Sequence, residues 1–427
     1  MKKSLHILFA VLLIAGSLFA QDLEEAQSLF NDGFYEEALN ITKQIVEENP
    51  QNAGANFLLG RIYFKMGELS QANTYVNKAI NIDRGNQEYR EISNKMRNFA
   101  NLRSEAQRLE SKGKYAEAVQ TYEEMIQENS NYAAAYFHAA RVLSFNLDKP
   151  VEGAEYLRKA IEIKPEEEKF KEMYNGITQN LLQQGITNLK RNNYTQALDN
   201  FKKVTQVDST NFYGFYFSGL ANFYNNNYEQ AIEYADKAIQ LNPRYIKSYM
   251  LKGKTYRATN QQQKAVEAYQ AALEVDDQYA DAWDKLGSVY NQMNENQKSA
   301  DAYQKLIKLQ PENGLAYTNL GAVYNQLEDY EKAVKYLEKA TKYRSEEPIP
   351  WYRLAVAYNE TGQTKKAITA ASNSLNYKPN WGPALLELGK AELKEGQRSK
   401  AKVHFSQAAK DPRYESKAQF YLDKLAN

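Results

Sequence analysis

The sequence of 427 residues contains no cysteine. This absence excludes disulfide bonds, thiolate metal sites, a cysteine nucleophile and lipid attachment at an N-terminal cysteine. Histidine is scarce as well: His6 lies among the first twenty residues, and His138 and His404 are far apart in the sequence. No group of these residue types has the spacing of a metal site. We therefore expect neither a metal ion nor another cofactor.

An excess of charge of one sign is also missing. The formal net charge is +1, with 54 basic and 53 acidic residues. A nucleic-acid partner is not expected, because such binding needs a strongly basic surface. Ten prolines and twenty glycines are few for this length and favour long helices. No glycine-rich loop follows a predicted strand, which argues against a nucleotide-binding loop.

Long hydrophobic runs are absent except at the start of the chain. Lys2 and Lys3 precede an almost wholly apolar run from Leu5 to Phe19, and a polar segment begins at Gln21. This order predicts a signal peptide over residues 1–20, followed by export to the periplasm or cell envelope of a Gram-negative-type bacterium. The alternative is an uncleaved N-terminal membrane anchor, although the run is shorter than the roughly 20 residues of a membrane span. After cleavage we expect no membrane insertion.

Small and aromatic residues repeat with a period of 34 residues. Glycines stand at 219, 253, 287 and 321, and further columns of small residues follow twelve and nineteen positions later, beginning at Ala231 and Ala238. Aromatic residues such as Trp283 precede the glycines by four positions. Within each unit the apolar residues recur at steps of three and four, which predicts two amphipathic helices. We expect the small residues where two helices approach closely, and Pro243, Pro311 and Pro379 after second helices.

These columns resemble the tetratricopeptide repeat (TPR) family. Residues 280–313 carry its motif most clearly, with Trp283, Leu286-Gly287, Tyr290, Tyr303 and Pro311, although Ser299 and Leu306 replace the alanines that the family prefers. The resemblance implies an all-α fold, a right-handed α-solenoid (superhelix) of about eleven TPR helix pairs with a C-terminal capping helix.

Four regions are predicted along the chain. The signal peptide at 1–20 is followed by an irregular N-terminal array at 21–177 and by a regular array of seven 34-residue repeats at 178–415. Helical insertions at 87–98 and 166–177 interrupt the irregular array; flexible joints are the alternative interpretation. Residues 416–427 form the capping helix, because their apolar residues lie on one side.

The resemblance also implies a concave groove lined by the first helix of each pair. Aromatic residues there can anchor partner side chains, basic residues can meet acidic groups, and asparagines one repeat apart can bond an extended peptide backbone. The alternatives are that the tyrosines cover neighbouring repeats and that the asparagines are solvated helix ends. The predicted groove residues are Tyr213, Tyr216, Phe223, Tyr224, Met250, Lys254, Arg257, Asn291, Asn325 and Asn359.

A carboxylate clamp of the kind that holds chaperone C-termini is not expected. Asn319 and Arg353 match it, but Asp284, Ser288 and Ile349 occupy its other positions. The sequence therefore predicts a non-catalytic scaffold or adaptor in the cell envelope that binds extended segments or helices of other proteins. An enzyme is not expected, because the signal, repeats and cap use up the chain. An inner-membrane-tethered adaptor or a secretion or assembly subunit is the alternative, and a glycan-binding module is a weaker one.

Overall fold

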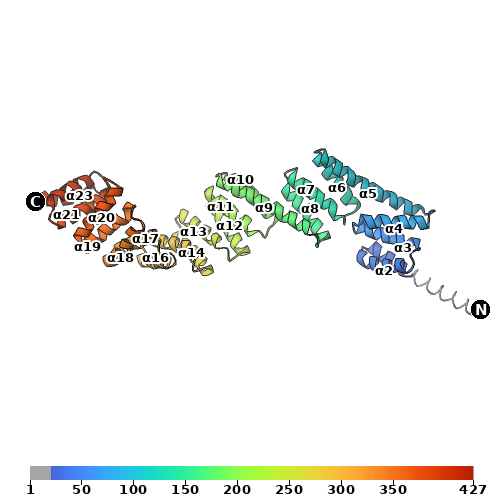
Figure 1. Cartoon of the computed structure of the whole chain (residues 1–427), viewed down its shortest axis with the longest axis horizontal. Coiled ribbons are helices and arrows are strands. Elements are labelled where there is room, and N and C mark those ends of the chain that lie inside the picture. Colours follow the sequence, from blue (N-terminus) through green and yellow to red (C-terminus); the bar gives the residue numbers. More distant parts are fainter. Residues whose placement is uncertain (1–20, 427) are drawn as a thin grey trace, which may run out of the picture. The chain divides into compact units, whose positions relative to one another are not determined.

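The computed structural model describes residues 21–426, and every regular element in that range is a helix (Figure 1). A helical segment over residues 21–32 comes first. The helices that follow are α2 (Tyr35–Glu48), α3 (Ala53–Lys65), α4 (Leu69–Ile82), α5 (Gln87–Ser111), α6 (Tyr115–Glu128), α7 (Ala133–Phe145), α8 (Pro150–Ile163), α9 (Glu168–Lys190), α10 (Tyr194–Val207), α11 (Phe212–Tyr224), α12 (Tyr228–Leu241), α13 (Ile246–Ala258), α14 (Gln262–Val275), α15 (Ala280–Gln292), α16 (Asn296–Leu309), α17 (Gly314–Gln326), α18 (Tyr330–Tyr343), α19 (Pro348–Glu360), α20 (Thr364–Tyr377), α21 (Gly382–Lys394), α22 (Arg398–Ala408) and α23 (Glu415–Ala426).

The helices form pairs that stack in chain order. Pairs such as α11 with α12 and α17 with α18 pack along their lengths, and second helices such as α12 and α18 also pack on the first helix of the following pair. The predicted prolines at 243, 311 and 379 each follow the end of a second helix, as expected. The predicted all-helical solenoid architecture is therefore confirmed.

Each turn inside a pair depends on one residue with a left-handed backbone. A positive φ recurs every 34 residues, at Asn226, Asn260, Asn294, Glu328, Gly362 and Gly396. Asparagine and glycine tolerate this conformation, which allows the chain to leave the first helix and start the second within a few residues. Glu328 is the exception, since glutamate gains nothing from that backbone region.

The regular 34-residue spacing of the glycines has a specific packing reason. A Cβ atom added at Gly253 would lie 2.5 Å from the ring of Tyr269, and one added at Gly389 would lie 2.6 Å from the ring of Phe405. At these positions the glycine of the first helix makes room for a ring of the second helix, sixteen residues later. At Gly219 the nearest atom is instead the backbone oxygen of Ala231, at 3.1 Å. The predicted close approach of the two helices at these glycines is confirmed. In several repeats, however, the glycine faces an aromatic ring of the second helix and not its backbone.

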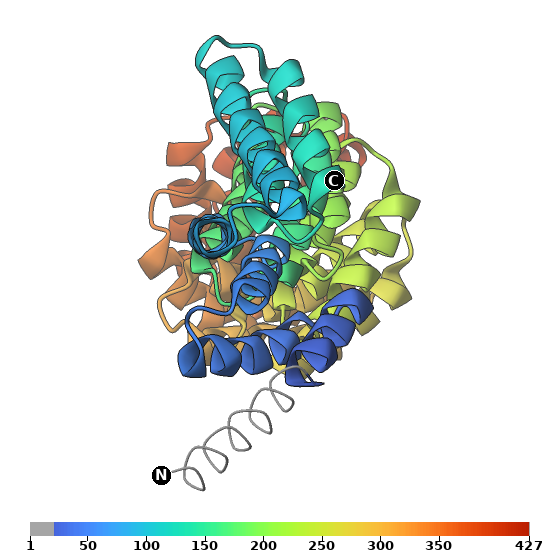
Figure 2. The same cartoon turned by 90° about the vertical axis from the view of Figure 1, so that its right-hand side faces the viewer.

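The chain forms two compact units. The first extends to Arg191 and includes Asp199–Ser209, and the second comprises Asn192–Leu198 and the chain from Thr210 onward, so α10 contributes to both. In the first unit, α5 has 25 residues and α9 has 23, against 13 or 14 in most other helices. The segment 87–98 is the first half of α5 (Figure 2), and most of 166–177 is the first half of α9. Both insertions thus lengthen a first helix.

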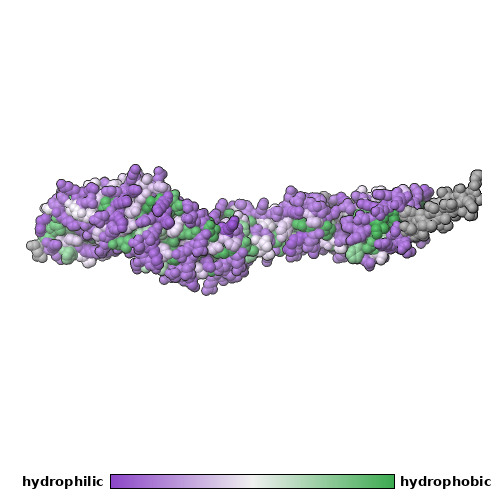
Figure 3. Space-filling view, turned by 90° about the horizontal axis from the view of Figure 1, so that it is seen from below, coloured by the Kyte–Doolittle hydropathy of each residue, from purple (hydrophilic) through white to green (hydrophobic). Residues whose placement is uncertain are grey.

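The last helix, α23, packs on α22 and covers its apolar side. Ala418 is fully buried, and the rings of Phe405 and Tyr421 stack with centroids 4.8 Å apart. Most of the face seen in Figure 3 is hydrophilic, with apolar patches between polar side chains. Within residues 21–426 no helix combines the length and apolar character that a bilayer crossing requires. The predicted signal peptide lies outside the described residues.

Candidate protein-binding groove

Three consecutive first helices of the second unit enclose a hollow of about 460 Å³. We call it the α11–α15 groove. It contains five of the ten predicted residues, because the repeat places the same helix face of α11, α13 and α15 side by side. They are Tyr216, Tyr224, Met250, Lys254 and Arg257. The remaining lining comes from Leu220, Lys247, Leu251, Tyr269, Tyr279, Asp281 and Lys285.

One wall of the groove is aromatic. Tyr224 is 44% exposed, and the ammonium group of Lys254 lies 4.6 Å from its ring centroid and 4.3 Å from that of Phe223. Such a contact holds the cation without neutralising it. Lys254 Nζ also lies 3.4 Å from the Tyr224 hydroxyl, to which it donates. Phe223 does not line the groove itself, but its ring contacts Lys254, which does.

Tyr213 and Tyr216 partly cover the next repeat, which was the alternative interpretation of these tyrosines. Tyr245, which precedes α13, makes edge contacts with both rings, at centroid distances of 5.5 Å and 5.0 Å. Tyr213 remains 43% exposed. Burial, assisted by Tyr279 and Tyr224, raises the pKa of Tyr216 to about 12. Its hydroxyl is therefore neutral at physiological pH and can donate a hydrogen bond.

The lining of the groove is also basic. Four cationic side chains line the hollow against the single carboxylate of Asp281. Lys285 is paired with Asp284 at 2.9 Å. In the described part of the chain, no carboxylate lies within ion-pair distance of Lys254 or Arg257. Arg257 lies beside Tyr269, where it opposes the rise in pKa that burial gives that tyrosine. The groove therefore carries uncompensated positive charge.

The three predicted asparagines lie outside this groove and bind neighbouring first helices. Asn291 Nδ2 donates to Gln326 Oε1 at 2.7 Å, and Asn325 Nδ2 donates to the backbone oxygen of Arg353 at 3.1 Å. Asn359 Nδ2 donates to the backbone oxygen and to a carboxylate oxygen of Glu387, both at 2.9 Å. These bonds connect α15 with α17, α17 with α19 and α19 with α21.

The expectation that Asn359 faces an open groove is wrong. Its side chain is fully buried, because Glu387 of α21 approaches it and is itself 5% exposed. A glutamate between Leu386 and Leu388, in an otherwise apolar stretch, was the sequence signal for this contact. Asn291 and Asn325 are partly buried, with their amide groups already engaged.

Sequence reasoning missed two aromatic residues at the rim of the groove. Tyr245 and Tyr279 lie 34 residues apart, each directly before a first helix. Burial raises the pKa of both hydroxyls. Both tyrosines lie just outside the helices that carry the repeat motif. Their spacing of 34 residues is the signal in the sequence that could have identified them.

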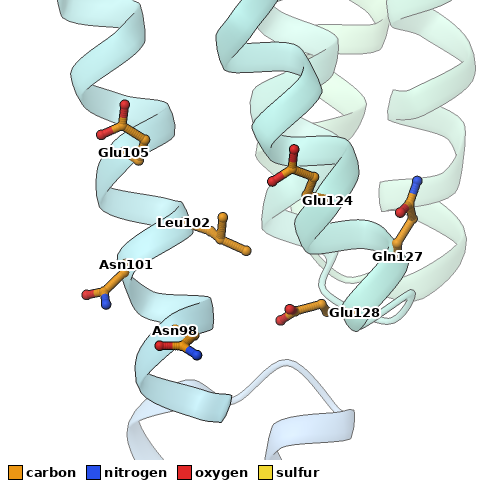
Figure 4. Close-up of a pocket in the computed structure, with 7 residues that line it drawn as sticks. All are labelled: Asn98, Asn101, Leu102, Glu105, Glu124, Gln127 and Glu128. Atoms are coloured by element: carbon orange, nitrogen blue, oxygen red, sulfur yellow. The ribbon is translucent and has the colours of Figure 1, made fainter. Parts of the chain in front are cut away.

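A further hollow in the first unit has a different chemistry. It lies between α5 and α6, has a volume of about 600 Å³, and is lined by carboxylates, amides and Leu102. Figure 4 shows Leu102 and Glu128 directed toward one another across the space. Arg108 binds Glu105 at 2.6 Å and lowers the pKa of its carboxyl. Among residues 21–426 no cluster of acidic or histidine side chains is placed to hold a metal ion.

Comparisons with known families agree with the repeat. Tetratricopeptide repeat models match residues 29–95, 280–313 and 314–346. A model of the N-terminal acetyltransferase A auxiliary subunit matches residues 166–283. No curated protein matches the sequence.

Several solved structures are similar to parts of the chain. The crystal structure of MamA protein is 28% identical, covering 39% of this chain and 92% of that one, with a TM-score of 0.37. YrrB, described as a TPR protein with an unusual peptide-binding site, is 22% identical over 45% of this chain and 100% of its own, with a TM-score of 0.41. A tetratricopeptide repeat protein from Parabacteroides merdae ATCC 43184 is 13% identical over 58% and 99%, with a TM-score of 0.41. With its 34-residue helix pairs and three matches to repeat models, the chain belongs to the tetratricopeptide repeat family.

Proposed function

We propose that this protein is a non-catalytic scaffold that captures a segment of a partner protein in the α11–α15 groove. Tetratricopeptide repeat proteins bind other proteins, which is the general role. The observation that carries the specific proposal is the position of Lys254 and Arg257. Both are cationic, both lie beside aromatic rings, and neither has a carboxylate partner in the described part of the chain. The partner segment is therefore acidic and carries an apolar or aromatic side chain.

This chemistry favours a protein partner over a glycan. A sugar would be bound through tyrosines and asparagines, which together suit hydroxyl groups. The amides of Asn291, Asn325 and Asn359 are instead bonded to neighbouring helices. What the groove offers is a set of rings and positive charges, which match an acidic segment with an apolar anchor.

Cross-linking in cells tests the proposal. A photoreactive phenylalanine in place of Tyr213 keeps an aromatic ring at the rim and is expected to trap a partner. The double change Tyr216→Ala and Tyr224→Ala is expected to abolish that product while helicity is retained. Tyr377→Ala is the matched control, because Tyr377 is 49% exposed and lies outside the groove. If the double variant still captured the partner in full, the result would contradict the proposal.

We also propose that the protein acts in a bacterial cell envelope, after export. The basic start and the apolar run of residues 1–20 support this location. An inner-membrane-tethered adaptor, or a secretion or assembly subunit that keeps this segment, is the alternative. A fusion of residues 1–30 to a reporter that is active only outside the cytoplasm is expected to give signal, and a silent reporter would contradict export. Mass spectrometry then separates the two forms, since a mature chain starting at Gln21 has been cleaved.

A further inference from the structure

The insertion at 87–98 builds a hollow that a regular 34-residue repeat would lack. As the first half of α5, it contributes Ile92, Lys95 and Met96 to the lining of a space of about 480 Å³ in the first unit. The helical segment 21–32 and α3 supply most of the remaining lining, and Glu128 at the end of α6 completes it. We call this space the insertion pocket. It lies in a different unit from the α11–α15 groove.

Arg61 is the most unusual residue of the insertion pocket. Its guanidinium carbon lies 4.6 Å from the ring centroid of Phe30 and 5.5 Å from that of Phe57. No carboxylate among residues 21–426 lies within ion-pair distance of it. Burial lowers the pKa of Arg61, an effect that Glu88 opposes, and the group stays charged at physiological pH. A partly desolvated cation that has no carboxylate in ion-pair contact gains more than an exposed one when a carboxylate arrives.

The other lining residues define what such a carboxylate must bring with it. Lys65 and Lys95 add positive charge to the lining, whose single carboxylate is Glu128, while Glu88 acts on Arg61 from outside the lining. Phe64, Ile92 and Met96 form an apolar wall, together with Phe30. Met96 is nearly fully buried, so Phe64 and Ile92 supply most of the apolar surface that a ligand can cover. A bare anion would satisfy the charges but leave the apolar wall uncovered.

We propose that the insertion pocket is a second docking site, which takes an acidic segment of a partner protein through a carboxylate placed next to an apolar side chain. The carboxylate pairs with Arg61, and the apolar side chain covers Ile92 and Phe64, next to Met96. Lys65 and Lys95 attract the segment from solution. This site is separate from the α11–α15 groove and does not depend on it.

Methyl NMR of the purified protein, labelled at its methionines, tests this proposal site by site. Met96 reports on the insertion pocket and Met250 on the α11–α15 groove. The probe is a nine-residue peptide of alternating leucine and aspartate; a peptide of alternating leucine and asparagine and inorganic phosphate are its controls. We expect the acidic peptide to shift the Met96 signal. If Met96 does not shift, or shifts equally with the asparagine peptide or with phosphate alone, the proposal is overturned.

Variants identify the residues responsible. Arg61→Gln is expected to weaken peptide binding at Met96 roughly tenfold or more, because it removes a charge-assisted hydrogen bond. Lys95→Glu changes an exposed side chain, so it leaves folding intact and is expected to weaken binding several-fold. Arg84→Gln removes one positive charge from the exposed turn before α5 and is expected to change nothing. Unchanged affinity in both pocket variants contradicts the proposal, whereas the Met250 response tests the α11–α15 groove independently.

Discussion

Gly253→Ala adds one methyl group where the first and second helices of a repeat meet. The new Cβ atom would lie 2.5 Å from Tyr269 Cε1 and 2.8 Å from Cδ1 and Cζ. Carbon atoms pack at about 3.5–4.0 Å, so the ring must move back by roughly 1 Å. Tyr269 is 1% exposed and belongs to the same core cluster as Ala265, Val266 and Leu286, which resist its displacement. Overpacking of this kind costs about 1–3 kcal/mol.

Helix propensity offsets part of this cost. Alanine is about 1 kcal/mol better than glycine inside a helix, so the net loss in unfolding free energy is about 1 kcal/mol. Gly287→Ala is the matched control: its Cβ atom would lie 3.0 Å from the ring of Tyr303, which needs to move only a few tenths of an ångström. For Gly287→Ala the two effects nearly cancel. We therefore expect Gly253→Ala to be about 1 kcal/mol less stable than Gly287→Ala.

The assay must resolve single repeats, because repeat arrays do not always unfold in one step. Hydrogen exchange of the α13 and α14 amides measures local opening, and urea unfolding gives the global value. In a Tyr269→Ala background the ring is gone, so Gly253→Ala is expected to become stabilising. The packing argument is refuted if Gly253→Ala is as stable as Gly287→Ala, or if the Tyr269→Ala background leaves its effect unchanged.

Three other changes test the packing, the inter-repeat bonds and the turns. Ala265→Leu overfills a fully buried position and is expected to lower the unfolding free energy by about 1–3 kcal/mol; an unchanged melting transition would count against the assigned register. Asn359→Ala leaves the buried Glu387 carboxylate without its amide donor and is expected to cost about 2 kcal/mol in urea unfolding, against less than about 1 kcal/mol for the partly exposed Asn291→Ala. Equal losses for the two asparagines would contradict this. Glu328→Asn relieves a left-handed backbone and is expected to raise the unfolding free energy by about 0.5–1 kcal/mol, whereas a loss would show that Glu328 makes a favourable contact.

Much of the fold could be predicted because one physical requirement repeats every 34 residues. The glycine at 253 and its partner ring at 269 recur in several units, so the alignment of a few columns predicts the helix pairs. The turns were harder to predict. Asn226, Asn260 and Asn294 share a positive φ, but Glu328 stands at the same point of the repeat and conceals the pattern. A local side-chain preference cannot reveal a backbone conformation that tertiary packing imposes.

The candidate site was predicted only in part, for a related reason. The motif positions of Tyr224, Lys254 and Arg257 predict a shared helix face, and the structure brings them into one groove. A motif position does not say what a neighbouring helix places opposite a side chain. Glu387 therefore decides that Asn359 is buried, although Asn359 occupies the same position in its unit as Arg257. The insertion pocket could not be predicted in this way, because residues 87–98 interrupt the 34-residue repeat and so have no motif positions.

In both proposed sites a cation lies against an aromatic ring and, among residues 21–426, has no carboxylate in ion-pair contact. Lys254 and Arg61 lie against aromatic rings, where the attraction is about 0.5–1 kcal/mol for exposed contacts and leaves the cation free to bind an anion. Lys390, by contrast, pairs with Glu387 at 2.8 Å, next to the buried Asn359. A cation held by a ring still attracts an acidic partner, whereas a cation paired with a carboxylate has lost most of that attraction.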